Sequence, residues 1–291
     1  MSVFNGSAVS LITPFHRGEV DLNAFTRLIE LQIASGTSAL VLFDTAGEGT
    51  SLTTDERLSV IQYVVERVNG RVPVVVGCGG PATDMVVDDC KTAEAIGADA
   101  LLIVPPYFTK ASERGLFEHF TSIADRVEIP ILLHNSPKRT GINLKPELIG
   151  ELVKHENIAG IKESGDSVEQ IMFLMALCPD ADVYAGNDNH VLPVLSIGGR
   201  GAISTIANVM PEAMHALYEA FQKSDIERAR DIQTQLIPLW RAAFCDVNPV
   251  PIKAMMSMLK LCDADVRLPL VPLEAANVHL VEETLRAYQL I

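Results

Sequence analysis

The sequence lacks several features that mark particular classes of protein. Its five cysteines are scattered, without a CxxC pair or a His/Cys spacing typical of metal ligands, which argues against both a disulfide framework and a zinc site. Basic residues are scarce, because 23 Lys and Arg stand against 37 Asp and Glu, for a net charge of −14. Nucleic acids and anionic membrane surfaces attract basic patches, so neither is an expected partner.

Long hydrophobic runs are absent as well. No stretch approaches the roughly 18 apolar residues of a membrane span, and the start, MSVFNGSAVSLITPF, lacks the basic region and long apolar run of a secretion signal. We therefore expect a cytoplasmic protein with reduced thiols. With 291 residues, 48% of them hydrophobic, the chain is long enough for one large α/β domain or two smaller ones.

Eight short apolar segments recur through the first two thirds of the chain. They are continuously hydrophobic, which is typical of parallel strands covered by helices on both faces. Between them lie segments of helical periodicity, several of which open with a capping residue such as Asp21, Thr54 or Ser112. Eight strand–helix units predict a (β/α)8 TIM barrel. The expected strands span residues 7–12, 38–43, 72–77, 98–104, 129–134, 158–162, 181–186 and 201–205.

The last part of the chain has the pattern of helix alone. We expect the catalytic barrel to occupy residues 1–224 and a C-terminal helical appendage, packed on the barrel, to occupy residues 225–291. A doubly wound sheet is the competing fold, but it would need a phosphate-binding turn after the first strand, and ITPFHRGEVD is not one. The glycine clusters GCGGPAT, residues 77–83, and GGRG, residues 198–201, lack the flanks of a nucleotide-binding motif, so we interpret them as turns.

A lysine ends the sixth expected strand, and in TIM barrels the active site lies at this end of the strands. Burying the charge of Lys162 there is costly unless it is paired or neutral. Desolvation favours the neutral amine, which attacks carbonyl carbon and forms a Schiff base. A structural lysine paired with Glu48 or Glu163 is the alternative. The position of Lys162 at the barrel mouth favours a catalytic lysine over a structural one.

Two other strand ends carry polar residues. The DTAGE turn, residues 44–48, could hold a substrate carboxylate through the Thr45 hydroxyl and backbone N–H groups. Taken alone, a plain β-to-α turn with Gly47 in an unusual conformation is the simpler interpretation. His134 ends the fifth strand, where a histidine is either a structural group or a proton shuttle near pH 7.

Several longer segments resemble those of one known family. Through these segments the chain resembles, essentially from end to end, the dihydrodipicolinate synthase and N-acetylneuraminate lyase family of Schiff-base-forming class I aldolases. The resemblance implies a barrel lysine that condenses with pyruvate or another 2-keto acid, no cofactor or metal, and a homotetramer built from two tight dimers. The segments are ASGTSALVLFDTAGEGTSLTTDER, VPPYFTKASERGLFEHF, ILLHNSPKRTG, IAGIKES, GGRGAIS and NPVPIK.

The resemblance also implies roles for single residues. Lys162 falls on the Schiff-base lysine, and Thr45 falls on the first hydroxyl residue of the family's Gly-Thr-Thr-Gly-Glu turn. Arg139 falls on an arginine at the site entrance, near the carboxylate of the second substrate. We further expect four residues to contact the substrate: Ala46, Gly186, Ile203 and Ser204.

Three departures from the family pattern affect catalysis. Ala46 replaces the second hydroxyl residue of the turn, and Phe108 stands where the synthases have a tyrosine that reaches across the tight dimer. His134 stands where most members have the tyrosine that transfers protons. Imidazole can do this acid–base work, so we expect Lys162 as the nucleophile and His134 as the acid–base group. Thr45, with the amide of Ala46, is expected to hold the substrate carboxylate.

These departures favour a Schiff-base lyase, an aldolase or dehydratase, that acts on pyruvate or another 2-keto acid and is not a true synthase. One alternative is a 4-hydroxy-tetrahydrodipicolinate synthase, which condenses pyruvate with aspartate semialdehyde. An alternative of another class is a barrel that binds a keto acid without turnover. The expected partners are therefore a pyruvate-like keto acid and an aldehyde.

Overall fold

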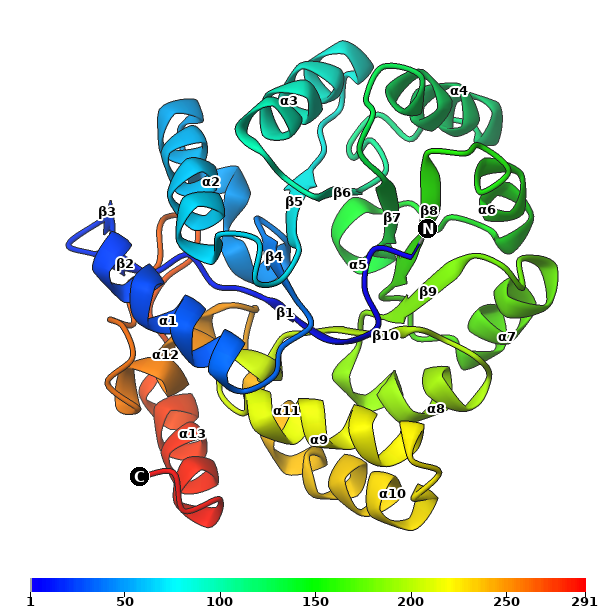
Figure 1. Cartoon of the computed structure of the whole chain (residues 1–291). Coiled ribbons are helices and arrows are strands. Elements are labelled where there is room, and N and C mark those ends of the chain that lie inside the picture. The colour runs from blue at the N-terminus through cyan, green and yellow to red at the C-terminus, as the bar shows by residue number, and fades with distance from the viewer. Residues whose placement is uncertain (1) are drawn as a thin grey trace.

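Eight parallel strands close into a barrel in the computed structural model, which describes residues 2–291 (Figure 1). Around the barrel the strands follow the order β1, β10, β9, β8, β7, β6, β5, β4. Each strand begins and ends within two residues of an expected segment, so the TIM-barrel prediction is confirmed. The strands are β1 (Gly6–Ser10), β4 (Ala39–Leu42), β5 (Val74–Cys78), β6 (Ala100–Ile103), β7 (Ile131–Asn135), β8 (Ile158–Glu163), β9 (Asp182–Ala185) and β10 (Gly201–Ser204).

A hairpin that the sequence pattern does not predict follows β1. Its strands, β2 (Phe15–His16) and β3 (Glu19–Val20), pair in antiparallel fashion outside the barrel. Strands of two residues are too short to show a hydrophobic period, which explains why the pattern misses them.

Helices alternate with the strands and form the outer layer (Figure 1). Asp21 and Ser112 cap α1 and α4 as expected. The cap of α2 is Thr53 rather than Thr54, because Thr53 forms a capping box with Glu56. The helices of this layer are α1 (Leu22–Ala34), α2 (Thr54–Val68), α3 (Thr83–Ile96), α4 (Glu113–Ala124), α6 (Pro146–Leu152), α7 (Val168–Leu177), α8 (Val191–Ser196) and α9 (Pro211–Gln222). The short helix α5 (Pro137–Thr140), which follows β7, lies inside this ring in the view of Figure 1.

Alternate side chains of the strands fill the barrel interior. The ring of Phe4 stacks on Tyr184 with 4.3 Å between centroids, and the Tyr184 hydroxyl donates to the Phe4 carbonyl at 2.7 Å. The N-terminal segment thus lies across one end of the barrel and leaves the carboxyl ends of the strands for a site. The interior cluster consists of Phe4, Ala8, Ala39, Val41, Val75, Ala100, Leu102, Leu132, Tyr184 and Ile203.

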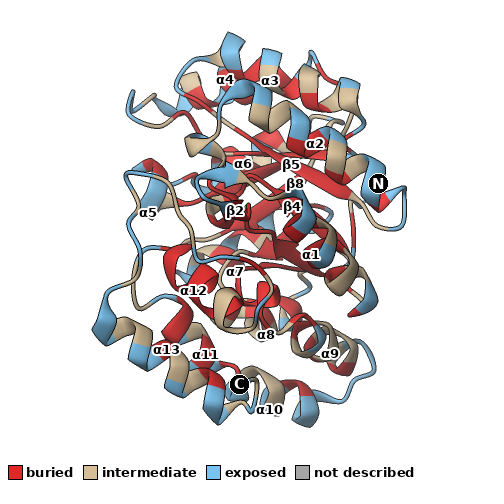
Figure 2. Ribbon diagram, turned by 90° about the vertical axis from the view of Figure 1, so that its left-hand side faces the viewer, coloured by how far each residue is buried: buried red, intermediate tan, exposed pale blue. Residues whose placement is uncertain are grey.

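Four further helices follow α9: α10 (Ile226–Gln235), α11 (Ile237–Ala243), α12 (Val250–Met258) and α13 (Ala275–Ala287). They confirm the expected C-terminal helices, whereas the division of the chain at residue 224 stays a prediction. Figure 2 shows α12 as buried, while α13 exposes part of its surface. No helix within residues 2–291 is long and apolar enough to cross a bilayer.

A buried ion pair joins α12 to the DTAGE turn. The Lys253 ammonium binds Glu48, and both side chains are almost fully buried. Lys253 also donates to the carbonyl of Asp265 at 2.8 Å, and Glu48 accepts the backbone N–H of Arg267 at 3.3 Å. The C-terminal region therefore holds the DTAGE turn in place.

Lys253→Met is expected to lower the free energy of unfolding by about 3–5 kcal/mol, because it leaves the Glu48 carboxylate buried without its counter-charge. Urea denaturation measures the loss. The control is Lys223→Met, which removes an exposed lysine paired with Glu219 on α9 and should cost much less. Equal losses in the two variants would contradict the structural role of the buried pair.

Candidate active site

Lys162 and His134 lie side by side at the ends of adjacent strands. β8 pairs with β7 so that Lys162 is opposite His134 and Glu163 is opposite Asn135. Successive residues of a strand point to opposite faces, so Lys162 and His134 share the inward face of Leu132, a residue of the barrel interior. Asn135 and Glu163 point away from it. The structure thus brings together the two residues expected to do the chemistry.

The partner of Lys162 is Asp44, the first residue of the DTAGE turn. Lys162 Nζ donates to Asp44 Oδ2 at 2.5 Å, and the two side chains are only 4% and 1% exposed. The sequence-based alternative named the wrong carboxylates, because Glu48 binds Lys253 and Glu163 lies on the other face of β8. The sequence also predicts that desolvation leaves Lys162 as a neutral amine, whereas in the structure Lys162 forms an ion pair with Asp44.

Glu163 instead links the ends of β7 and β8. Asn135 Nδ2 donates to both of its carboxylate oxygens, at 3.0 and 2.9 Å, and the Gly165 N–H donates to Oε1 at 2.6 Å. Burial raises the pKa of Glu163, and these hydrogen bonds offset only part of the rise. This carboxylate therefore supports the strands beneath the site.

His134 lies on the other side of Asp44. Its Nδ1 is 3.4 Å from Asp44 Oδ1, and its Nε2 is 3.0 Å from Ser164 Oγ. A carboxylate can only accept, so we assign the proton of the neutral ring to Nδ1, with the Ser164 hydroxyl donating to Nε2. Lys162, Asp44, His134 and Ser164 form one connected row, which we call the proton row.

The pKa values in the proton row are shifted by burial and by charge. Burial acts to raise the pKa of Asp44, but the charge of the neighbouring Lys162 ammonium and the hydrogen bonds that Asp44 accepts together outweigh burial and hold that pKa well below its usual range. Burial and the charge of Lys162 lower the pKa of His134 from 6.5 to about 3, against the opposite effect of Asp44. His134 is therefore neutral at pH 7, and the expected titration near that pH does not match the structure.

Gly186 follows β9 and makes room for the proton row. A Cβ at this position would lie 2.0 Å from Ser164 Oγ, so any side chain would push Ser164 away from His134. The backbone N–H of Gly186 donates to the Glu163 carbonyl at 2.7 Å. Direct contact of Gly186 with a substrate stays a prediction.

The remaining expected residues surround the proton row. Thr45 and Ala46 form the turn that follows Asp44, with Ala46 buried and Thr45 half-buried. Ile203 belongs to the barrel interior, and Ser204 Oγ accepts the N–H of Ala207 at 3.0 Å. These positions are compatible with the expected substrate contacts, which stay predictions.

Arg139 and Phe108 lie outside the proton row. Arg139 is an exposed residue of α5 and donates to the Asn248 carbonyl at 3.1 Å. Phe108 is 94% exposed. The roles expected for them, at the site entrance and at a dimer interface, stay predictions.

Two buried acids near the carboxyl ends of the strands, Asp44 and Asp188, had no assigned role in the sequence analysis. Asp44 lies two residues after the end of β4, so its place at the barrel mouth was readable from the sequence, but Glu48 in the same turn and Glu163 at the end of β8 lie at this end of the barrel as well. Asp188 is 3% exposed and accepts the Ile206 N–H at 3.3 Å. Burial raises the pKa of Asp188 to about 6, although hydrogen bonds, including one from Ser204, act against the rise. Only the side-chain distances in the structure show which of these acids is the partner of Lys162.

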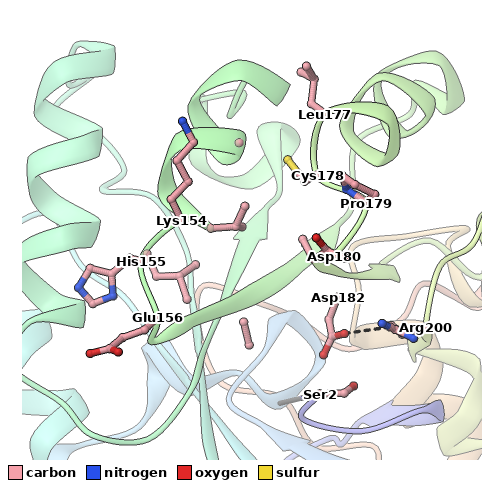
Figure 3. A pocket seen from close by; sticks show the side chains of 15 residues that line it. Ser2, Lys154, His155, Glu156, Leu177, Cys178, Pro179, Asp180, Asp182 and Arg200 are labelled. Carbon is pink, nitrogen blue, oxygen red and sulfur yellow. Dashed lines mark hydrogen bonds and ion pairs between the residues drawn. The ribbon is translucent and has the colours of Figure 1, made fainter.

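A hollow of about 520 Å³ lies at the opposite end of the barrel (Figure 3). Residues before and at the start of β8 and β9 line it, among them Lys154 and Cys178. Asp182 and Arg200 form an ion pair of 3.0 Å at its edge. None of the expected site residues lines this hollow, so it is separate from the proton row.

Comparison with known proteins identifies the family of this chain. The sequence model of the dihydrodipicolinate synthetase family matches residues 3–288. The chain belongs to this family. It is 42% identical over 289 residues to a 4-hydroxy-tetrahydrodipicolinate synthase of Caldicellulosiruptor bescii, covering 99% of this chain and 98% of the relative. It is 40% identical over 290 residues to one of Geobacter metallireducens, covering 99% and 100%.

Solved structures of the dihydrodipicolinate synthetase family share the fold. Dihydrodipicolinate synthase of Aquifex aeolicus has a TM-score of 0.96 at 38% identity, with 99% of both chains covered. The Acinetobacter baumannii enzyme, solved with pyruvate, has a TM-score of 0.97 at 32% identity, with both chains fully covered. A relative described as a monomeric variant has a TM-score of 0.97 at 34% identity, covering 99% and 98%.

These comparisons confirm the family and an enzyme of the lyase type. They give no support to the expectation that the chain is not a true synthase, because its full-length curated relatives carry the synthase name. That expectation rested on three substituted side chains. The alternative, 4-hydroxy-tetrahydrodipicolinate synthesis, fits the findings better.

Acid is expected to destabilise the protein through His134. Folding lowers the pKa of His134 from 6.5 to about 3, so below pH 6.5 the unfolded chain binds a proton that the folded chain does not. Stability is therefore lost as the pH falls. Between about pH 7.5 and about pH 5.5, wild type should lose about 1.4 kcal/mol relative to His134→Gln. Urea denaturation at both pH values tests this, and an unchanged difference would show that His134 titrates normally.

Proposed function

We propose that this protein is a 4-hydroxy-tetrahydrodipicolinate synthase that condenses pyruvate with aspartate semialdehyde through a Schiff base on Lys162. The observation that carries the proposal is a buried lysine at the carboxyl end of a barrel strand, in a chain similar over its full length to enzymes of that name. The pyruvate complex of the Acinetobacter baumannii relative supports pyruvate as the keto acid.

The proposed reaction begins with attack of Lys162 Nζ on the keto carbon of pyruvate, whose keto oxygen leaves as water. The resulting imine acidifies the adjacent methyl group. Loss of a methyl proton gives an enamine, and its carbon attacks the aldehyde carbon of the second substrate. In this proposal Thr45 and the amide of Ala46 hold the pyruvate carboxylate, and Arg139 meets the carboxylate of the aldehyde.

A second candidate is a lyase that cleaves or dehydrates another 2-keto acid. It is favoured by the residues that replace hydroxyl groups of the synthases, which are Ala46, Phe108 and His134. The negative charge of Asp44 beside the lysine also repels the carboxylate of a substrate, which changes what the site can bind. Both candidates share the Schiff base and differ in the substrate that follows it.

We also propose the homotetramer implied by the family resemblance. The exposed side chain of Phe108 is free to contact a second chain. The monomeric relative shows that family membership alone leaves the oligomeric state open.

Trapping with borohydride tests the Schiff base. Incubation with pyruvate and borohydride should add one reduced pyruvyl group, which peptide mapping should place on Lys162. Lys162→Ala should remain unlabelled, whereas Lys138→Ala, which removes a lysine with a 75% exposed side chain on α5, should be labelled like wild type. Label that survives Lys162→Ala would refute the assignment.

Turnover separates the candidates. A kcat/KM of about 10⁴ M⁻¹s⁻¹ or more with pyruvate and aspartate semialdehyde would support the synthase. Faster turnover with another 2-keto acid from a panel would support the lyase. Trapping without turnover of any of them would indicate a binding barrel instead.

A further inference from the structure

Asp44 lies where it can exchange a proton with Lys162. Its Oδ2 lies 2.5 Å from Nζ, the atom that attacks the substrate in the proposed function, and both side chains are almost fully buried. An ammonium group cannot attack a carbonyl until it loses a proton. In a site closed to water, that proton must go to a group within hydrogen-bond distance.

We propose that Asp44 is a catalytic residue that moves the protons of Schiff-base formation, an inference that rests on the proposed function. Lys162 first passes a proton to Asp44 Oδ2, and the neutral amine bonds to the keto carbon as the carbon–oxygen π bond breaks. The added nitrogen loses a proton and the oxygen gains one. Asp44 then protonates this hydroxyl, which leaves as water. The products are the iminium ion and the Asp44 carboxylate.

The iminium ion needs a counter-charge, and the regenerated Asp44 carboxylate supplies it. The overall step converts the ammonium group and the ketone into an iminium ion and water, so no other reactant is consumed. Asp44 stabilises a positive charge on the nitrogen both before and after the reaction. This electrostatic role requires Asp44 to be a carboxylate at the start and at the end of the step, and to hold the proton only in between.

His134 has a supporting place in this arrangement. Its Nδ1 lies 3.4 Å from the other carboxylate oxygen of Asp44, whereas no direct hydrogen bond between His134 and Lys162 occurs in residues 2–291. With the proton assigned to Nδ1, the ring donates toward Asp44, and Ser164 orients the ring from the other side. His134 is thus a positioning residue for Asp44 in this step.

A purely structural role would also place a carboxylate beside a buried lysine, and the two roles predict different pH profiles. If Asp44 accepts the proton, the rate of imine formation in wild type depends little on pH, because the ion pair carries its own base. If solvent accepts the proton, the rate rises about tenfold per pH unit as the free amine accumulates.

The experiment measures the initial rate of borohydride-trapped imine with pyruvate between about pH 6 and about pH 9. Asp44→Asn should slow it about 10²–10⁴-fold near neutral pH and make it rise with pH. Asp44→Ala should be slow as well, and formate should restore part of its rate, while chloride at equal ionic strength should not. Asp182→Asn is the matched control, because it changes a buried aspartate paired with Arg200 at the other end of the barrel. It should stay within about twofold of wild type.

The results distinguish this inference from the function on which it rests. If wild type is not labelled by pyruvate, the proposed function fails, and the role of Asp44 fails with it. If wild type is labelled and Asp44→Asn is labelled at a similar rate with the same pH profile, only the role of Asp44 fails. Should the variants not fold, a tenfold rise per pH unit in wild type alone would overturn the proposal, and a flat profile would support it.

Discussion

The ion pair between Lys162 and Asp44 is the interaction on which the site depends. Taking a single charge out of water costs several kcal/mol, so neither group could be buried here without the other. The two residues come from β8 and from the turn after β4, and they are 118 positions apart in the sequence. The barrel must therefore hold both segments in register for the pair to form, and the site forms only with the whole fold.

Other parts of the structure fix the two sides of this pair. On the strand side, the pairing of β7 with β8 sets His134 next to Lys162, and Gly186 leaves room for the Ser164 hydroxyl. On the turn side, the C-terminal region binds the DTAGE turn through Lys253 and Glu48. The barrel and the C-terminal helices thus both position the Asp44 carboxylate next to the Lys162 amine.

The sequence alone predicts much of this fold, because continuous apolar strands and amphipathic helices at regular spacing leave few other architectures. It also places Lys162 and His134 at the same end of the barrel, since both close a parallel strand. It does not identify the acid beside the lysine, because Asp44, Glu48 and Glu163 satisfy the same rule and differ only in direction and distance. The pKa of His134 is equally hidden, since it depends on burial and on a neighbouring charge. Substituted side chains, weighed singly, also argued against the synthase that full-length similarity supports.

The most direct test of this account is a crystal structure of the protein after borohydride reduction with pyruvate. We expect continuous electron density from Lys162 Nζ to the former keto carbon of pyruvate. We also expect Asp44 within hydrogen-bond distance of that nitrogen, at about 2.7–2.9 Å as for other charge-assisted pairs. Density on another lysine would contradict the account, and so would an adduct on Lys162 from which Asp44 had turned away.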